Sequence, residues 1–313
     1  MRRMLQETAA ELTLGSVEML RNWVASHQDQ LRILDARCAK DQGATIYEIF
    51  HEINDDDFWS DLLTLEFDNY ENIKKVLPGL PPETLQRNWC GTSGYTLSLQ
   101  SCEFYTRTKE VFARENGKSL STARILDFGC GWGRLLRYWS KDAPSTNLFG
   151  CDPDEEILDI CREIRITATL ARSDWRPKQL PFNWRFDLIY AYSVFTHLSP
   201  TVFNECLAAI GSSLESNGVV ILTVRPESYL DFRGGELARL SDSQIEELRK
   251  RFERKGFAFD PHNRQPVEGE ITYGEAIVSS AYIQKNWALA FDITELGAMT
   301  SDPYQVMVVL KKV

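Results

Sequence analysis

One short segment constrains this chain more than any other, because it predicts a buried strand that runs through a glycine-rich turn into a helix. The segment covers residues 124–134 and has the sequence RILDFGCGWGR. Three glycines occupy alternate positions of the turn: Gly129, Gly131 and Gly133. Glycine tolerates positive φ angles and lets a ligand approach bare main chain. Backbone N–H groups at a following helix start attract the polar or anionic part of such a ligand.

The glycine spacing separates this turn from the best-known dinucleotide site. The residues follow the pattern GxGxG, whereas the dinucleotide fingerprint is GxGxxG. The turn therefore favours a different nucleoside cofactor on a similar strand–turn–helix unit.

An acidic residue ends the next expected strand, over residues 147–152. Asp152 lies nineteen positions after Gly133 and is followed by Pro153. A carboxylate at the tip of the second strand of a βαβ unit can accept hydrogen bonds from both ribose hydroxyls of a nucleoside. Residues 154–156 are acidic, which suits the N-terminus of the next helix.

Further apolar runs predict the rest of a sheet. Residues 186–190 and 218–224 are expected to be buried strands, the second one introduced by an Asn-Gly turn. Strands that alternate with helical patterns indicate a parallel sheet with helices on both faces.

From these residues a resemblance follows. The block from 124 to about 224 resembles a class I S-adenosylmethionine-dependent methyltransferase. Its matching motifs are LDFGCGWGR, GCDPD, Ser-Asp-Trp at 173–175 and FDLIYAYSVFTHL, and residues 291–312 resemble the closing antiparallel strand pair of that fold. The resemblance implies an α/β fold: a Rossmann-like doubly wound, mostly parallel seven-stranded sheet with an antiparallel C-terminal strand, plus an N-terminal helical region. It covers roughly two thirds of the chain.

The resemblance also implies how S-adenosylmethionine would be held. Asp152 would accept the ribose hydroxyls, Asp174 the adenine amino group, and Trp175 would lie against or beside the adenine ring. The methionine end would meet Gly129, Cys130 and Gly131, with Asp127 orienting that loop or the ammonium group and Ala191 offering its backbone carbonyl. Gly133 and Pro153 complete the expected cofactor residues. In similar enzymes a segment ahead of the first strand closes over the cofactor, which makes Thr92, Ser93 and Gly94 candidates, although an ordinary turn between helices fits them equally well.

Two residues beyond the fourth expected strand are candidates for catalysis. His197 has a side chain that titrates near neutral pH and could act as a general base, and Tyr192 could line the methyl path. His197 in SVFTHL could equally cap or pack the following helix. Arg134 and Arg137 suggest an anion contact at the helix start, with Arg137 expected on an outer face.

The chain is expected to divide at its proline cluster, residues 77–82. Residues 1–82 predict an N-terminal helical region, with Ser16 as a helix N-cap, and residues 83–313 the methyltransferase domain. An insertion at about 225–273 is expected to form a cap and to govern substrate choice. The acidic run 55–57 predicts a helix start rather than a metal site, and no metal is expected.

Charge and cysteine content limit the partners. The net charge of -10 argues against a general nucleic-acid binder. The sequence contains no run of about 18 apolar residues, so we expect no membrane span. Its seven cysteines have no metal-ligand spacing, which suits a cytoplasmic protein.

Three functions compete at this point. The first is a methyltransferase acting on a small-molecule or saccharide-type acceptor, expected to be methylated at oxygen. The second is an NAD(P)-dependent oxidoreductase, and the third is a catalytically inactive methyltransferase-like binding module. The acceptor and the oligomeric state stay open.

Overall fold

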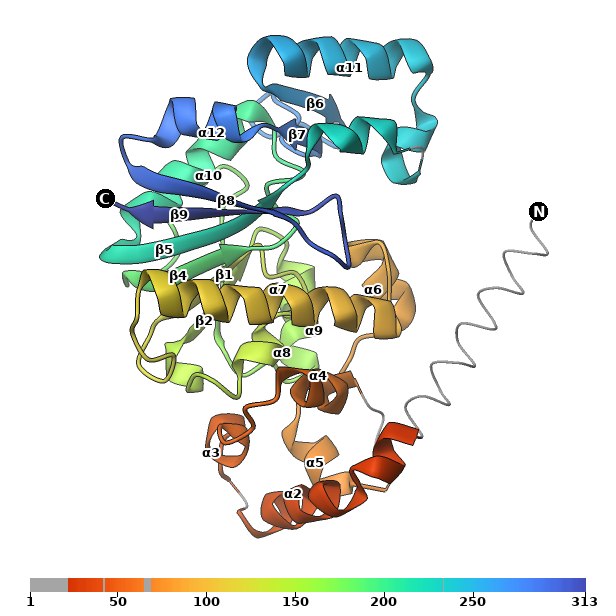
Figure 1. Ribbon diagram of the computed structural model, residues 1–313, viewed down its shortest axis with the longest axis vertical. Helices are drawn as coiled ribbons and strands as arrows, with labels where there is room; N and C mark the ends of the chain where they lie inside the picture. Colours follow the sequence, from red (N-terminus) through yellow and green to blue (C-terminus); the bar gives the residue numbers. More distant parts are fainter. Residues whose placement is uncertain (1–21, 42, 65–68, 233) are drawn as a thin grey trace, which may run out of the picture.

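A seven-stranded sheet forms the centre of the molecule (Figure 1). The structure is a computed structural model, and it describes residues 22–41, 43–64, 69–232 and 234–313. Its strand order is β3-β2-β1-β4-β5-β9-β8. The strands, in chain order, are β1 Ile125–Phe128, β2 Leu148–Asp152, β3 Thr169–Arg172, β4 Phe186–Ala191, β5 Leu214–Val224, β8 Phe291–Ala298 and β9 Val306–Lys312. The expected α/β fold is therefore confirmed.

The last strand is the antiparallel one. Neighbouring strands from β3 to β5 pair in parallel, whereas β9 lies antiparallel to both β5 and β8. The register with β5 runs from Val219 opposite Lys311 to Val224 opposite Val306. Because β9 enters from β8 by a short connection and not through a crossover helix, it must run against β8.

Helices cover both faces of the sheet. The long helix α7, Gly94–Glu115, and the short α8, Leu136–Trp139, pack with the first of two large apolar clusters, while α10, Pro200–Ser212, and α12, Ser280–Trp287, pack with the second. Alternate residues of one strand supply the two clusters, as in β4, where Leu188 faces the first and Ile189 the second. Helix α9, Glu155–Glu163, lies beside β2 and β3 and begins at the capping residue Asp154.

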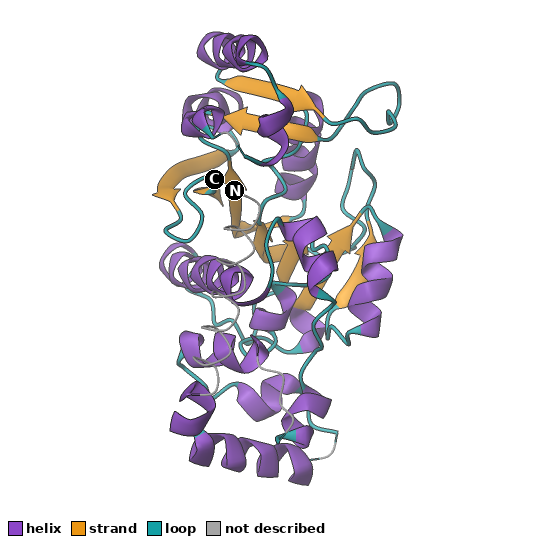
Figure 2. Cartoon of the chain, turned by 90° about the vertical axis from the view of Figure 1, so that its right-hand side faces the viewer, coloured by secondary structure: helices purple, strands orange, loops and turns teal. Residues whose placement is uncertain are grey.

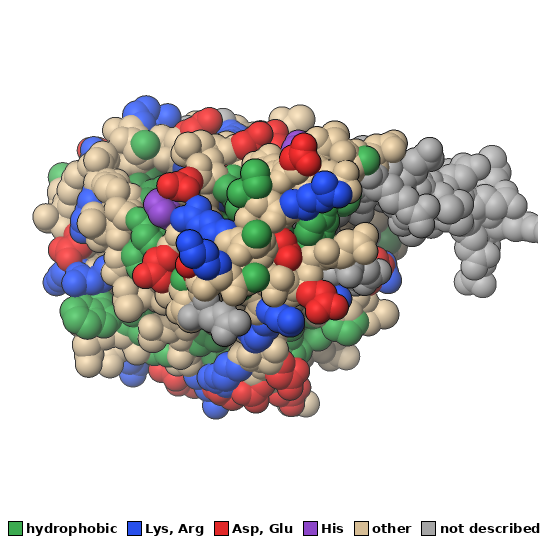
Figure 3. Space-filling view, turned by 90° about the horizontal axis from the view of Figure 1, so that it is seen from below, with side chains coloured by type: hydrophobic (Ala, Val, Ile, Leu, Met, Phe, Trp, Pro, Cys, Tyr) green, Lys and Arg blue, Asp and Glu red, His purple; other side chains and the backbone are tan. Residues whose placement is uncertain are grey.

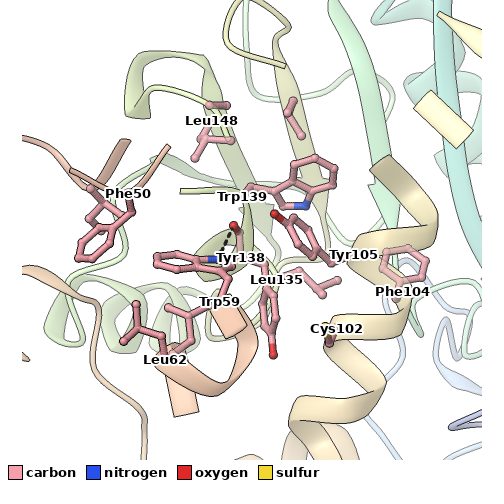
Figure 4. Packing of buried hydrophobic residues seen from close by; sticks show 14 of the residues in the cluster. Phe50, Trp59, Leu62, Cys102, Phe104, Tyr105, Leu135, Tyr138, Trp139 and Leu148 are labelled. Carbon is pink, nitrogen blue, oxygen red and sulfur yellow. Dashed lines mark hydrogen bonds between the residues drawn. The ribbon is translucent and has the colours of Figure 1, made fainter. Parts of the chain in front are cut away.

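Short helices from the N-terminal part of the chain extend the first cluster, namely α2 Gln28–Lys40, α3 Ile46–Phe50, α4 Asp56–Thr64 and α5 Glu71–Val76. Helix α6, Glu83–Cys90, packs instead against a small cluster around Trp132, through Leu85 and Cys90. Figure 4 shows Trp59 of α4 beside Tyr138, whose backbone carbonyl accepts a hydrogen bond of 2.9 Å from the indole N–H. Asp55 accepts a bond of 2.9 Å from the backbone of Phe58, so the acidic run begins a helix as expected. The expected cap at Ser16 lies outside the described residues.

Arg137 does not lie on an outer face as expected. It is buried, and its guanidinium donates to the carbonyl oxygens of Leu63 and Pro78. Burial lowers the pKa of Arg137 to about 10. The error arose because helix α8 has only four residues and is covered by the N-terminal helices, which a local pattern does not reveal.

The insertion after β5 forms a separate cap at the top of Figure 1. It contains the 3-10 helices η2, Glu227–Asp231, and η3, Gly235–Arg239, then α11, Asp242–Lys255, and a hairpin of β6, Phe257–Pro261, with β7, Gly274–Val278. The second hairpin strand thus begins just past the expected end of the insertion at 273. Figure 2 shows the cap and the N-terminal helices at opposite ends of the molecule, with the sheet between them.

The surface charges and the hydrophobicity of the helices can be compared with what the sequence predicts. Figure 3, taken from the end that carries the N-terminal helices, shows acidic and basic side chains interspersed. Among the described residues, no helix is long and apolar enough to cross a membrane. One apolar cluster contains residues from both sides of the expected boundary between residues 82 and 83. We propose the division there on the sequence pattern.

Candidate functional site

The glycine turn is held open by its own backbone geometry. Gly129, Gly131 and Gly133 all have positive φ angles, of 74°, 53° and 78°. A Cβ atom at Gly129 would lie 2.5 Å from Val194, whereas one at Gly131 would meet nothing closer than Trp89, at 3.8 Å. Gly129 is therefore needed for packing, while Gly131 leaves main chain open to a ligand.

Asp152 connects this turn to the second strand. Its two carboxylate oxygens accept hydrogen bonds from the backbone N–H groups of Gly131, at 2.9 Å, and Asp154, at 3.0 Å. Burial raises the pKa of Asp152 to about 6, although both bonds oppose the shift. Each oxygen keeps a further lone pair, so the carboxylate can accept two more donors from a ligand.

A cavity of about 400 Å³ opens at this edge of the sheet. Seven of the expected cofactor residues line it: Gly129, Cys130, Gly131, Asp152, Pro153, Asp174 and Trp175. They come from the turns after β1, β2 and β3, because the carboxyl ends of parallel strands meet at one edge. The structure thus brings together residues that are up to 46 positions apart in sequence.

Three expected cofactor residues lie behind the cavity wall. Asp127, Gly133 and Ala191 are not among the residues that line it. Burial raises the pKa of Asp127 to about 8. A Cβ atom at Gly133 would lie 2.7 Å from Ile166, so this glycine serves packing.

The loop ahead of α7 approaches the cavity with other residues than expected. Thr92, Ser93 and Gly94 do not line it, whereas Asn88, Trp89 and Cys90 do. Ser93 instead accepts a hydrogen bond of 2.6 Å from Arg87, and the Gly94 backbone donates to Gln86. The packing of α6 decides which of its side chains face the cavity. The composition of the loop after it did not indicate these residues.

The two candidates for catalysis occupy different places. Tyr192 lines the cavity, and its hydroxyl has no hydrogen-bond partner among the described residues. The guanidinium of Arg134 lies 4.6 Å from the centre of its ring. His197 does not line the cavity: its Nδ1 lies 2.8 Å from the carbonyl oxygen of Gly274, and its ring stacks on Tyr273.

The comparisons with known proteins agree with this arrangement. Residues 125–218 match the family model described as a methyltransferase domain. That segment is a methyltransferase domain of the class I type. S-adenosylmethionine is the cofactor of such a domain.

Relatives extend the likeness only in part. The cyclopropane-fatty-acyl-phospholipid synthase of Escherichia coli (strain K12) is 26% identical over 102 residues, which are 32% of this chain and 25% of that enzyme. The uncharacterized protein RP028 of Rickettsia prowazekii (strain Madrid E) is 26% identical over 125 residues, 38% of this chain and 49% of that protein. The chain thus spans a quarter to a half of the length of these curated relatives.

A solved structure shares the fold. The PH0226 protein from Pyrococcus horikoshii OT3 aligns with a TM-score of 0.50 at 14% identity, covering 75% of this chain and all of that one. At this identity the likeness supports the fold of the methyltransferase domain and nothing finer.

The cavity residues fit the cofactor of this domain. Asp152 offers acceptor lone pairs for ribose hydroxyls, and Gly131 offers bare main chain. Arg134 lines the same cavity, and no carboxylate of the described residues lies within 4.0 Å of its guanidinium. A cation of this kind suits the carboxylate at the methionine end of S-adenosylmethionine.

Other lining residues of the methyltransferase domain escaped sequence reasoning. Ser193 lies two residues after the end of β4 and has a φ of 59°. Its hydroxyl accepts a hydrogen bond of 3.0 Å from the side-chain amide of Gln305. Asp302 and Gln305, from the turn between β8 and β9, also line the cavity. Ser193 lies three positions after the expected strand 186–190 and could have been found there. Asp302 and Gln305 reach the site only because β9 folds back beside β5.

Proposed function

We propose that this chain is an S-adenosylmethionine-dependent methyltransferase that transfers a methyl group to a small-molecule or saccharide-type acceptor, at oxygen. One observation carries the proposal: Asp152, at the end of β2, is tied to the open Gly131 turn in the wall of the cavity. Asp174 and Trp175 line the neighbouring part of the wall, where the adenine would lie.

The cavity also has room and chemistry for an acceptor. Besides the residues assigned to the cofactor, it is lined by Trp89, Gln100, Tyr192, Asp302 and Gln305. Aromatic rings and amides suit a ring-shaped acceptor that carries hydroxyl groups. The Oε1 atom of Gln305 is buried and has no partner among the described residues, so it is free for such a hydroxyl.

The reaction requires alignment and the removal of a proton. The cofactor supplies an electrophilic methyl group that is bound to a sulfonium sulfur. When the acceptor oxygen attacks this methyl group, the sulfur leaves as a neutral thioether. Holding two reactants in line can contribute roughly 7–11 kcal/mol toward the barrier. We assign the proton to Asp302, because it is the carboxylate of this part of the cavity and burial raises its pKa. Tyr192 would line the methyl path, and His197 would support the wall from behind.

The sheet argues against the oxidoreductase. A dinucleotide-binding sheet continues in parallel through its sixth strand, whereas here the antiparallel β9 lies next to β5. An inactive binding module would share every feature of the cofactor site and differs only in turnover. The seven unpaired cysteines suit the reducing cytoplasm, which we propose as the location.

Calorimetric titration with S-adenosylmethionine tests the cofactor site. We expect Asp152→Asn to lower the affinity by roughly a hundredfold, because it removes the charge that accepts the ribose hydroxyls. Asp159→Asn is the matched control, since Asp159 is an exposed aspartate of α9 outside the cavity. Equal affinities of wild type and Asp152→Asn would contradict the proposed site.

Product analysis tests turnover. Wild type incubated with labelled S-adenosylmethionine and a panel of metabolites and glycans is expected to give a methylated product that is detected by mass spectrometry. Cofactor binding without any labelled product would favour the inactive binding module.

A further inference from the structure

The cap contributes directly to the wall of the cavity. The loop between β6 and β7 brings Arg264 and Thr272 to it, and Tyr273 follows immediately before β7. These are residues of the insertion, far in sequence from the glycine turn. The cap is therefore part of the site and not only a neighbour of it.

Contacts on the adenine side hold this loop down. Arg176, next to Trp175, lies 3.2 Å from Glu268 at the tip of the loop. Ser199 donates a hydrogen bond of 2.7 Å to Glu270. The tip itself is a tight turn, with positive φ at Glu268 and Gly269. The loop thus lies over the turns that follow β3 and β4, beside the expected adenine position.

The ring of Tyr273 is fixed from two directions. His197 stacks on it with ring centres 4.8 Å apart and an angle of 11° between the planes. The guanidinium of Arg264 lies 4.1 Å from its centre. No carboxylate of the described residues pairs with that guanidinium, which is held at the cavity by the ring alone.

A buried carboxylate explains how His197 keeps its place. Glu275 is 2% exposed and lies 3.5 Å from His197, 3.3 Å from His262 and 2.8 Å from Arg225. Burial raises the pKa of Glu275, but the two histidines and Arg225 outweigh it and hold the pKa well below its usual range. The cluster lies behind Tyr273 and supports it, which gives His197 and His262 a positioning role.

We propose that Tyr273 and Arg264 of the cap bind the adenosine part of S-adenosylmethionine. Tyr273 would contact the nucleoside with its edge and hydroxyl, and Arg264 would cover it with its planar guanidinium. The proposal rests on the proposed function and adds to it that the insertion takes part in cofactor binding.

Calorimetry with S-adenosylhomocysteine tests the contact without turnover. We expect Arg264→Ala to raise the Kd about tenfold and Tyr273→Ala to raise it more, whereas Tyr273→Phe keeps the ring and stays within about threefold. The matched control is Arg251→Ala, an exposed arginine of α11 that pairs with Glu247. Melting curves without ligand show whether the Tyr273→Ala variant still folds. The side chain of Arg264 is exposed, so Arg264→Ala leaves the core intact.

The position of the contact is tested by nuclear Overhauser effects in tyrosine-labelled protein with S-adenosylhomocysteine bound. We expect effects between the Tyr273 ring and the adenine or ribose protons, and we expect them to vanish in Tyr273→Phe with unlabelled phenylalanine. Wild-type affinity in Arg264→Ala and Tyr273→Ala, or effects to methionine protons alone, would overturn this inference only. Failure of wild type to bind S-adenosylhomocysteine would contradict the proposed function as well.

Discussion

Asp152 combines a cofactor contact with an unfavourable position for a charge. Both of its oxygens accept backbone N–H bonds, which favours the ionised form, yet burial raises its pKa to about 6. The balance places its titration close to neutral pH.

Cofactor affinity should therefore fall in mildly acidic solution. Because the ionised carboxylate accepts the ribose hydroxyls, affinity is nearly full at pH 8, is about half of that at pH 6 and falls further at lower pH. Between pH 8 and pH 5 we expect the Kd for S-adenosylhomocysteine to rise roughly tenfold. The measurement is calorimetry across this range, and Asp152→Asn should give a nearly flat profile. An equally steep profile in the variant would assign the titration to another group.

Gly133 has a purely structural importance that can be measured. Its φ of 78° and a Cβ only 2.7 Å from Ile166 both oppose a side chain. We expect Gly133→Ala to reduce the free energy of unfolding by about 3 kcal/mol, in urea denaturation followed by circular dichroism. Gly91→Ala separates the two causes, because Gly91 has a φ of 75° and no atom within 4 Å of a Cβ. It should cost about 1 kcal/mol, and an equal loss in both variants would remove the packing argument.

At the scale of elements, a charged cluster joins α4 to the rest of the fold. Asp56 at the start of α4 lies 2.8 Å from Lys109 of α7 and 3.1 Å from Lys141, which follows α8. The side chain of Lys141 is 1% exposed. Burial raises the pKa of Asp56, but the two lysines lower it further, so the net shift is downward.

Removing this carboxylate should loosen the N-terminal helices. Asp56→Asn removes one of the two carboxylates that Lys109 and Lys141 share, the other being Asp142, and we expect the free energy of unfolding to fall by about 2 kcal/mol. The sign is fixed by the lowered pKa: the stabilisation is present above the unfolded pKa of about 3.9 and is lost as the pH falls through the folded value. Asp29→Asn, in an exposed pair with Arg32, should change stability by less than 0.5 kcal/mol in the same urea titration. Similar losses in both variants would contradict a special role for the cluster.

Short elements marked the limit of prediction from local pattern. The strands β1, β2 and β4 were predicted because they are mostly apolar runs. Helix α8 has four residues and is too short for a helical pattern to show which of its faces is covered. The burial of Arg137 therefore became visible only with the N-terminal helices in place.

At the scale of the whole molecule, the site draws on four distant parts of the chain. The sheet edge provides Asp152 and the glycine turn, the cap provides Tyr273, and the turn between β8 and β9 provides Asp302. Helix α6 provides Trp89, while the helices before it contribute to the same apolar cluster as the sheet. Each part adds a separate section of wall.

The sequence by itself determined the part of this site that the sheet edge provides. Strand, turn and acidic residue follow one another within 30 positions, and local backbone rules fix where each of them lies in a βαβ unit. Only the tertiary structure decided the rest of the cavity wall. Asp302, Gln305, Arg264 and Tyr273 approach the cavity because β9 pairs with β5 and the cap hairpin folds over the sheet edge. Such long-range pairings are set by the packing of whole elements and leave no periodic signal in the residues that they bring together.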